Sequence, residues 1–215
     1  WGTTKTGTTF TSNFTTAEGY CSLTGGVDDS PDSGDIQTGW NLFADADQVD
    51  VSLLITGSIS TTDQKFVQDN IAKSRKDCIS FHSPQFASCV NNAGGEEASI
   101  TSDKGLLAAT SYSFMDSNWK YMYDRYNDKY RWVPLNGDTA GLCVATDLER
   151  EAWYSPAGFN RGQIKNAVKL AWSPTKANRD NLYKIGVNPI INSPGAGIVL
   201  FGDKTLLSQP SAFDR

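Results

Sequence analysis

The sequence is poor in histidine, the residue on which most hydrolytic sites and many metal sites depend. Its 215 residues include one histidine, His82. A hydrolase of the Ser-His-Asp type would need this histidine as its base, and no serine lies in a G-x-S-x-G motif. A single histidine also excludes a metal site built from several of them. We predict that His82 ends a strand with local hydrogen bonds, and we expect no catalytic and no metal-binding residues.

Cysteine is scarce and shows no metal-binding pattern. The four cysteines are Cys21, Cys78, Cys89 and Cys143. None forms a C-x-x-C pair, which argues against a zinc knuckle. Cys78 and Cys143 lie within apolar runs, and we expect all four thiols to be reduced, as in a protein assembled in the cytosol.

Motifs for nucleotides and calcium are missing as well. The segment "PGAGIVL" has Leu200 where G-x-G-x-x-G needs its third glycine, and its glycines precede a strand instead of a helix. The segment "DADQVD", residues 45–50, lacks the glycine and the distal glutamate of a calcium loop, which is typical of a solvated loop. Glu149 and Glu151 have the pattern of exposed charges at a helix end. We therefore expect no cofactor.

Charge and hydropathy argue against two further classes of partner. The net charge is −5, whereas nucleic-acid binding needs a basic surface. No run reaches the roughly 18 apolar residues that a membrane helix needs. Hydrophobic residues make up 39% of the chain, which is enough for a sizeable core. We expect a folded protein without direct nucleic-acid contact and without membrane insertion.

Composition divides the chain near residue 35. Residues 1–35 are rich in Thr, Ser, Gly and Asp, which is typical of the end of a β/loop-rich module followed by a linker. Residues 36–215 show the periodic apolar patterns of an α/β core domain. The opening segment "WGTTKTGTTF" has neither an initiator Met nor an apolar signal core, so we expect a piece of a longer protein.

The first part of the core domain predicts a βαβ unit. Residues 48–56 alternate apolar and more polar side chains, which indicates a strand. Residues 60–77 combine an apolar stripe with a capping box of Ser60 and Asp63, which indicates a helix. Residues 78–81 form a second apolar run. Two strands joined by a helix of this length are expected to pair in parallel.

The remainder predicts further helices and two strand pairs, in an α/β fold with a mixed sheet and flanking helices. The expected elements are a helix at 102–113 capped by Ser102, two strands around Asn127-Asp128 within 118–134, a helix with a small-residue face at 137–152, an amphipathic helix at 162–172, a short helix at 173–186 capped by Ser173, and two strands around Pro194-Gly195 within 187–202. Trp172 continues the apolar stripe of its predicted helix, so we expect it in the core.

The run "WYSPAGFNRG", residues 153–162, is the most unusual segment, and two predicted helices flank it. It is rich in the residue types that dominate interface energies. Two interpretations stay open: a contact loop for another subunit, or a loop packed on its own core. The candidate contact residues are Trp153, Tyr154, Pro156, Phe159 and Arg161. We expect Arg161 to reach solvent and to meet a neighbour's carboxylate, with an internal bridge to Asp147 or Glu151 as the alternative.

Several segments, in this order, resemble the tail sheath proteins of contractile bacteriophages, most closely the T4-like members. "LTGGVDD" (23–29) is similar to the turn that opens the family's core, and "VDVSLLITGS" (49–58) is similar to the strand that follows. "VPLNGDTAGLCVATDLEREAWYSPAGFNRG" (133–162) resembles the signature segment of the family. "GVNPIINSPGAGIVLFGDKTL" (186–206) resembles its closing segment. The resemblance covers roughly residues 23–215.

This resemblance implies a subtilisin-like sheath core and a structural role without enzyme activity. It implies that copies polymerise around a tail tube and contract, driving the tube through the host envelope for genome ejection. The implied partners are other sheath subunits, the tail tube protein, the baseplate and the tail terminator, in a virion tail assembled in the host cytoplasm. Family members continue beyond the position of Arg215 into a C-terminal domain and also carry an N-terminal arm, so we expect this piece alone to be monomeric.

Two other functions stay open from the residues alone. A degenerate serine hydrolase would share the subtilisin-like fold, and labelling with a serine-directed fluorophosphonate would reveal it. A glycan-binding module of a phage particle would use the aromatic residues of the predicted hairpin, and binding to a glycan array would reveal it. Those residues are Trp119, Tyr121, Tyr123 and Trp132.

Overall fold

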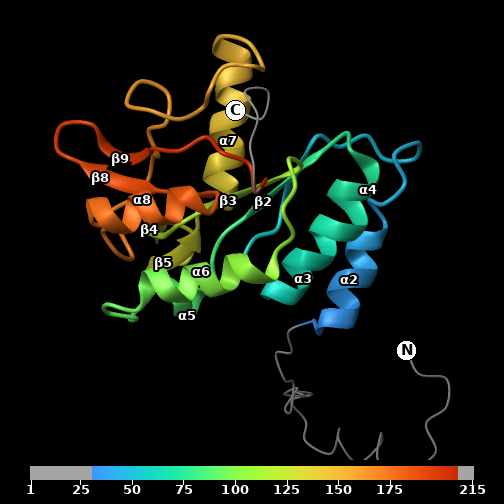
Figure 1. Ribbon diagram of the computed structural model, residues 1–215, viewed down its shortest axis with the longest axis horizontal. Coiled ribbons are helices and arrows are strands. Elements are labelled where there is room, and N and C mark those ends of the chain that lie inside the picture. Colours follow the sequence, from blue (N-terminus) through green and yellow to red (C-terminus); the bar gives the residue numbers. More distant parts are fainter. Residues whose placement is uncertain (1–30, 208–215) are drawn as a thin grey trace, which may run out of the picture. The chain divides into compact units, whose positions relative to one another are not determined.

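The computed structural model describes residues 31–207 (Figure 1). The predicted β/loop-rich segment at 1–35 lies almost entirely outside these residues, as does the first of the sheath-like motifs, at 23–29. The first described helix, α2 (Ser33–Asn41), begins just before the expected boundary, with the side chain of Asp32 accepting a hydrogen bond from the backbone of Asp35. The division into 1–35 and 36–215 therefore stays a prediction.

A four-stranded parallel sheet forms the centre of the fold. Its strands, in spatial order, are β1 (Leu53–Ile55), β2 (Ile79–His82), β3 (Ser113–Asp116) and β7 (Val187–Asn188). All three neighbouring pairs run parallel, and Leu54 is opposite Ser80, which is opposite Ser113. The predicted βαβ unit is confirmed, although β1 is shorter than the expected strand at 48–56.

The helix between β1 and β2 is continuous but changes its winding. It consists of α3 (Thr61–Phe66), a π-helical stretch η1 (Val67–Ala72) and α4 (Lys73–Arg75). The predicted cap is confirmed, because the Ser60 hydroxyl accepts a hydrogen bond from the backbone N–H of Asp63 at 3.2 Å. The wide turn was not predicted. It places the buried amide of Gln68 against Ala108, donating to the carbonyl at 3.0 Å and accepting from the N–H at 2.7 Å.

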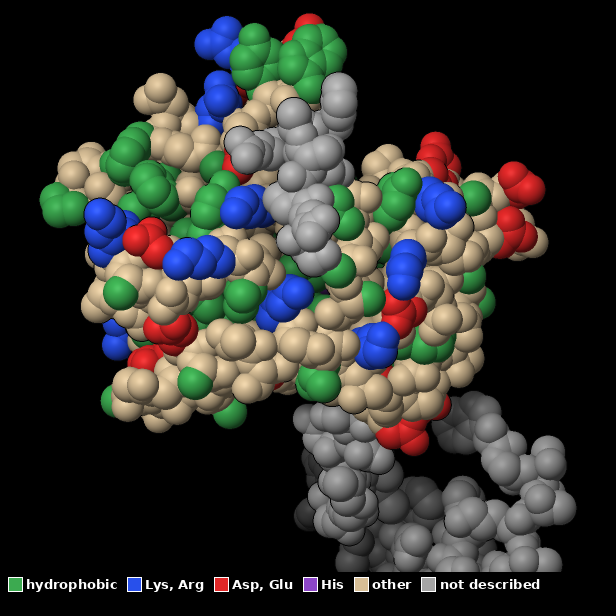
Figure 2. Space-filling view, in the orientation of Figure 1, with side chains coloured by type: hydrophobic (Ala, Val, Ile, Leu, Met, Phe, Trp, Pro, Cys, Tyr) green, Lys and Arg blue, Asp and Glu red, His purple; other side chains and the backbone are tan. Residues whose placement is uncertain are grey.

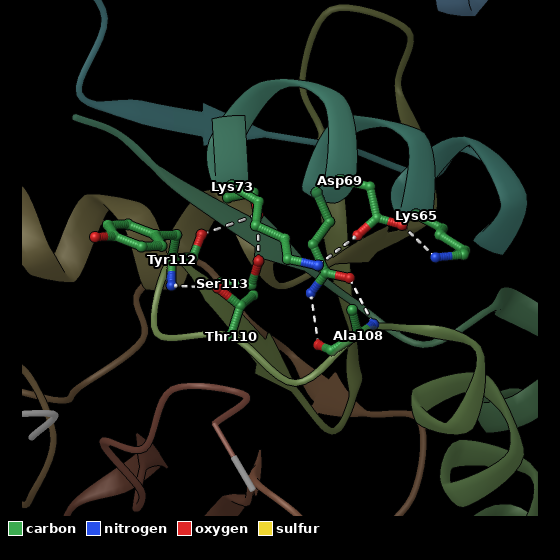
Figure 3. Close-up of polar contacts among 9 residues, drawn as sticks. Lys65, Asp69, Lys73, Ala108, Thr110, Tyr112 and Ser113 are labelled. Carbon is green, nitrogen blue, oxygen red and sulfur yellow. Dashed lines mark hydrogen bonds and ion pairs between the residues drawn. The ribbon is translucent and has the colours of Figure 1, made fainter. Parts of the chain in front are cut away.

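Ion pairs on the outer face of the same helix support this winding. Lys65 and Lys73 both pair with Asp69, which lies between them one turn away in each direction (Figure 3). Such exposed pairs contribute a few tenths of a kcal/mol each. The helix is therefore held against the segment before β3 mainly by the buried side-chain amide of Gln68. The ion pairs of Asp69 stabilise the exposed side of the helix itself.

The remaining helices cover both faces of the parallel sheet. They are α5 (Phe86–Cys89), α6 (Glu96–Leu106), α7 (Asn136–Glu149) and α8 (Lys176–Lys184). Because side chains alternate along a strand, one face presents Phe81 and Phe114 to α7, and the other presents Leu54 to η1 and Met115 to the region of α6 and α8. Figure 1 shows α7 on one side of the sheet and α3 and α6 on the other.

Antiparallel strands form two separate small sheets. One contains β4 (Trp119–Asp124), β5 (Lys129–Pro134) and β6 (Lys169–Leu170), in the order β5-β4-β6, and the other pairs β8 (Ile190–Ser193) with β9 (Gly197–Leu200). Both predicted strand pairs are confirmed. The α/β class is confirmed too, but the parallel and antiparallel strands, expected in one mixed sheet, lie in different sheets.

Two helix predictions need correction in their bounds, and a third is confirmed only in part. The helix expected at 102–113 lies at 96–106, where Glu96 and Glu97 favour a helix N-terminus; Ser102 is inside it, and residues 113–116 are a strand. The short helix expected from Ser173 begins at Lys176 with Thr175 as its cap. The helix at 137–152 is confirmed as α7, but of its small residues only Ala140 is buried, whereas Gly141 and Ala145 are exposed.

The amphipathic helix expected at 162–172 is wrong. This segment is extended, because strand partners take its backbone groups: Ile164 N–H donates to the Ile198 carbonyl, Val168 to Tyr121 and Ala171 to Trp119, each at 2.8 or 2.9 Å. Trp172 is nevertheless buried, at 8% exposure, and its indole N–H donates to the Ser117 carbonyl at 2.9 Å. Its predicted core position is confirmed, although the helical reason for it is not.

Candidate functional site

Helix α7 carries one wall of the candidate site, and its start is fixed by the parallel sheet. The backbone N–H of Asn136 donates to the Ser83 hydroxyl at 3.0 Å, just after β2. The Asn136 side-chain amide donates to the Gly57 carbonyl at 2.7 Å, just after β1. Because these bonds join the helix N-terminus to the ends of two strands, they set the direction in which α7 leaves the sheet.

The glycines of the 153–162 loop fasten it to β9. Gly158 N–H donates to the Leu200 carbonyl at 2.9 Å, and Leu200 N–H donates to the Gly162 carbonyl at 2.8 Å. Gly158 has a φ of +100°, which other residues rarely adopt, and a Cβ at Gly162 would lie 2.7 Å from the Leu200 oxygen. The loop is therefore held on the body by contacts that only glycine permits at these two positions.

Arg161 supports the loop from within the chain. Its Nε donates to the Ser155 carbonyl at 2.8 Å, and its guanidinium carbon lies 5.4 Å from the centre of the Tyr154 ring. The side chain is half-buried. The expectation that it reaches solvent is therefore wrong, and the alternative bridge to Asp147 or Glu151 is not formed among the described residues. Arg161 closes a turn of the loop and stacks on its tyrosine.

The loop presents aromatic side chains to solvent. Trp153 is 74% exposed and stacks on Tyr154, with ring centres 6.3 Å apart. Phe159 and Phe201 form a second, half-exposed pair at 5.7 Å. Leu148, at the end of α7, is 81% exposed, and Figure 2 shows hydrophobic side chains gathered at the tip of α7. Large exposed apolar patches are typical of protein contact sites.

A groove of about 650 Å³ lies beside this loop. The floor of the groove is the face of the parallel sheet on which α7 packs. The last two turns of α7 form a wall, and residues 152–156 form the rim. The lining of the groove includes Phe81, Phe114, Asp147, Trp153 and Asp203. Asp147 and Asp203 are the charged residues among the described side chains that line it, so the groove is apolar with an acidic edge.

Of the predicted contact residues, the structure brings three to the groove and leaves two outside it. Trp153, Tyr154 and Pro156 line it. Phe159 pairs with Phe201 instead, and Arg161 hydrogen-bonds to the Ser155 carbonyl within the loop. Whether these residues contact another subunit stays a prediction.

Residues near His82 resemble a catalytic set in type but not in arrangement. His82 is fully buried, with Nε2 at 2.9 Å from the Ser80 hydroxyl, and burial lowers its pKa to about 3. The Ser83 hydroxyl donates to Asp116 instead of facing the imidazole. Burial also raises the pKa of Asp116 to about 8, although the Ser83 hydrogen bond acts in the opposite direction. The predicted local bonding of His82 at a strand end is confirmed.

The cysteines in the described part of the chain are unpaired. Cys78, Cys89 and Cys143 are free thiols, as predicted, and Cys21 lies outside the described residues. Burial raises the pKa of Cys78 and of Cys143 to about 11, so both thiols are protonated at neutral pH. Within residues 31–207, no three metal-ligating side chains gather at one place, and no helix is long and apolar enough to cross a membrane.

The aromatic hairpin residues that a glycan-binding module would use lie partly in the core and partly at the surface. Trp119 is buried, stacks edge-on against Phe86, and donates its indole N–H to the Pro84 carbonyl at 2.8 Å, so its assignment to an exposed platform is wrong. Tyr121 and Trp132 pack against each other with ring centres 4.8 Å apart. Tyr123 is the member that is largely exposed, at 45%.

A family model described as the phage tail sheath protein central domain matches residues 39–206. The chain belongs to the phage tail sheath family. It is 41% identical to the tail sheath protein of Enterobacteria phage T4 over 92% of this chain and 33% of that protein. It is also 41% identical to the tail sheath protein of Vibrio phage KVP40, over 93% of this chain and 33% of that protein. The chain thus spans about a third of the length of these relatives, and the resemblance seen in its motifs is confirmed.

Solved sheath structures share the fold of this sheath chain. The helical sheath of the anti-feeding prophage in its contracted state matches with a TM-score of 0.59 and 16% identity, over 86% of this chain and 46% of that one. The sheath tail protein Lin1278 from Listeria innocua matches with a TM-score of 0.54 and 11% identity, over 89% of this chain and 38% of that one. At such identities the likeness shows the fold alone.

Sequence reasoning missed most of the groove in this sheath chain. Phe81, Phe114 and Asp203 come from β2, β3 and the segment after β9, far apart along the sequence. Only the parallel pairing brings the first two side by side, and only the closing segment brings the third. An apolar run in a buried strand gives no signal that part of one face stays open, so pattern reading could not have found this site.

Proposed function

We propose that this chain is the core of a structural sheath subunit that polymerises around the tail tube and contracts, driving the tube through the host envelope for genome ejection. The match of residues 39–206 to the sheath central domain carries this proposal. The identity of 41% to the T4 tail sheath protein supports it. The likeness to a sheath solved in the contracted helical state is in keeping with it.

The proposed partners are other sheath subunits, the tail tube protein, the baseplate and the tail terminator. The exposed aromatic side chains of the 153–162 loop support a contact role, because tryptophan and tyrosine contribute strongly to interfaces when a partner covers them. Contraction would repack many such modest contacts between two lattices. The proposed location is the virion tail, assembled in the host cytoplasm.

We also propose that this chain has no enzyme activity and that its core shares the topology of subtilisin-like folds. The parallel sheet with helices on both faces supports the second point. The burial of His82, Ser83 and Asp116 supports the first, because a substrate would have to reach them. A serine-directed fluorophosphonate should leave the protein unlabelled, and labelling that His82→Ala abolishes would contradict this.

Electron microscopy of the full-length protein that contains this chain tests the main proposal. Expressed alone or with the tail tube protein, the product should form hollow tubes, because a sheath subunit encodes its own helical contacts. Tubes that shorten and widen when destabilised would support contraction. A product that stays monomeric at every concentration, with and without tail tube protein, would contradict the proposed function.

A further inference from the structure

The turn between β4 and β5 is a second exposed feature, and it protrudes from the surface. Its side chains Arg125 and Tyr126 are called the knob below. Tyr126 is 83% exposed at its apex. Arg125 lies beside it, donating from Nη2 to the Tyr126 hydroxyl at 2.8 Å and stacking 4.9 Å from the ring centre. Tyrosine and arginine are enriched among residues that dominate binding energy. An exposed arginine–tyrosine pair at the apex of a hairpin is therefore suited to binding a partner.

The hairpin holds this pair rigidly and engages its own carboxylates in local contacts. Asp124 accepts from the Asn127 amide at 2.7 Å and pairs with Arg131 at 3.0 Å. Asp128 accepts from the Tyr123 hydroxyl. Both carboxylates of the turn therefore have partners within the hairpin, and the Arg125 guanidinium lies beside the exposed ring at the apex. A preorganised element loses little entropy on binding.

The groove beside α7 is complementary to this knob. It is apolar, its volume of about 650 Å³ accommodates an aromatic ring with a guanidinium beside it, and its charged lining residues are Asp147 and Asp203. Asp147 is exposed on α7 and forms no hydrogen bond or ion pair with the described residues. Asp203 already accepts from the Tyr183 hydroxyl at 3.3 Å, which makes Asp147 the better acceptor for an incoming arginine.

The knob and the groove belong to different surfaces of one chain. No residue of β4, β5 or their turn is among those that line the groove. The hairpin turn lies at the far end of β5 from Pro134, whereas α7 begins just after Pro134 and reaches the groove with its last turns. A contact that joins two different patches is heterologous, so it repeats from copy to copy and builds either a ring or an open helical array.

We propose that the β4–β5 turn of one sheath chain inserts Tyr126 into the groove of a second copy, with Arg125 paired to Asp147 of that copy. This inference rests on the proposed function and names the partner of the groove. The second copy is favoured because the same chain supplies both a basic aromatic knob and an acidic apolar hollow. A heterologous contact is also what a tube requires.

Charge exchange in the complete reading frame tests the contact. Arg125→Asp and Asp147→Arg should each raise the concentration needed for tube formation by about tenfold or more, the effect of losing one charge pair and gaining a repulsion. The two changes together in one chain should restore most of the assembly, because the pair re-forms with reversed sign. The matched control is Lys165→Asp, an exposed charge outside both surfaces, which should not rescue Asp147→Arg.

Crosslinking tests the same contact without relying on tubes. Protein carrying Tyr126→Cys is mixed with protein carrying Ala152→Cys, a groove residue, and a short thiol crosslinker is added. Both proteins have their four native cysteines changed to alanine, because Cys143 also lines the groove. Dimers containing one of each should form, in soluble oligomers as well as in tubes, and Leu106→Cys in place of Tyr126→Cys should give none. Leu106 is 59% exposed on α6, away from both surfaces.

The outcomes separate this contact from the general function. Tubes in the wild type that neither charge change impairs, together with no mixed dimer, would overturn the contact and leave the proposed function standing. Impairment by Asp147→Arg without impairment by Arg125→Asp would show that a different segment fills the groove, which also overturns it. A wild type without tubes would contradict the proposed function, and the mixed dimer would still decide the contact.

Discussion

Asp116 lies at the end of β3 with none of its surface exposed, and its environment opposes ionisation. Burial raises its pKa to about 8, whereas the ordinary carboxyl value is 3.8. Between these values the folded chain keeps a proton that the unfolded chain has lost. Stability therefore falls as pH rises from about 4 to about 8, and it levels off above that.

Asp116→Asn should flatten this pH dependence. The amide has nearly the same shape and carries no charge, so the variant should gain stability relative to wild type as pH rises from about 5 to about 8. The measurement is urea unfolding of both proteins at several pH values. Asp147→Asn, an exposed carboxyl, is the control and should follow wild type. Parallel curves for Asp116→Asn and wild type would show that Asp116 is ionised in the fold at neutral pH.

Trp172 and Trp153 form a matched pair that tests burial at single residues. Trp172 is 8% exposed with its indole N–H bonded to a carbonyl, and Trp153 is 74% exposed. Trp172→Ala should lower the free energy of unfolding by about 3–5 kcal/mol, and Trp153→Ala should change it by about 0.5 kcal/mol or less. Thermal or chemical unfolding gives both values. Equal effects would contradict this difference in burial.

Among the elements, the junction between the 153–162 loop and β9 decides where the aromatic surface lies. The loop follows α7 directly, and its return is fixed by backbone bonds from Gly158 and Gly162 to Leu200. These bonds leave no room for a side chain at Gly162. The loop position is thus set by backbone geometry, and the aromatic side chains are carried on it.

Gly162→Ala should destabilise the chain by about 1–3 kcal/mol, because the new methyl would meet the Leu200 oxygen at 2.7 Å. Gly141→Ala is the matched control. Gly141 lies within α7 with nothing within 4 Å of a Cβ, so alanine there should stabilise the helix by about 0.5–1 kcal/mol. Melting temperatures of the two variants should move in opposite directions. A loss of stability in both would show that glycine matters at α7 for a reason outside this chain's own packing.

At the scale of the chain, the packed parallel sheet stabilises the fold, whereas the exposed aromatic side chains of the 153–162 loop are available for contacts with other molecules. Among residues 31–207, helices pack on both faces of the parallel sheet, and the groove opens beside α7. The exposed rings and the groove contribute little to the stability of the isolated chain. Their contribution is expected in the polymer, where neighbours would cover them.

Trp153→Ala should therefore separate folding from assembly. The melting temperature should stay near wild type, because the ring is largely exposed. In the complete reading frame, tube formation should require a severalfold higher protein concentration, since a large aromatic at an interface typically contributes more than about 1 kcal/mol. Leu106→Ala, an exposed apolar residue on α6, is the control. Unchanged tube formation with Trp153→Ala would remove this loop from the sheath contacts.

Local patterns in the sequence were sufficient wherever neighbours along the chain decide the structure. Short-range hydrogen bonds and apolar periodicity determine four of the features described above. These are the Ser60 cap, the βαβ unit, the turn at Asn127-Asp128 and helix α7. The family also follows from the order of such segments. These features are fixed by contacts that the sequence itself places within a few residues or within one supersecondary unit.

Only the tertiary structure decided the segments whose backbone partners are far away. Residues 162–172 have a helical apolar period, yet β4 and β9, from the two antiparallel sheets, take their N–H groups, so the chain is extended there. Arg161 has the position of an exposed contact residue, yet the fold turns it onto Ser155 and Tyr154. The groove exists only because β2, β3, α7 and residues 203–205 converge. Periodicity describes which side chains share a face, whereas hydrogen-bond partners and open space depend on which distant segments meet that face.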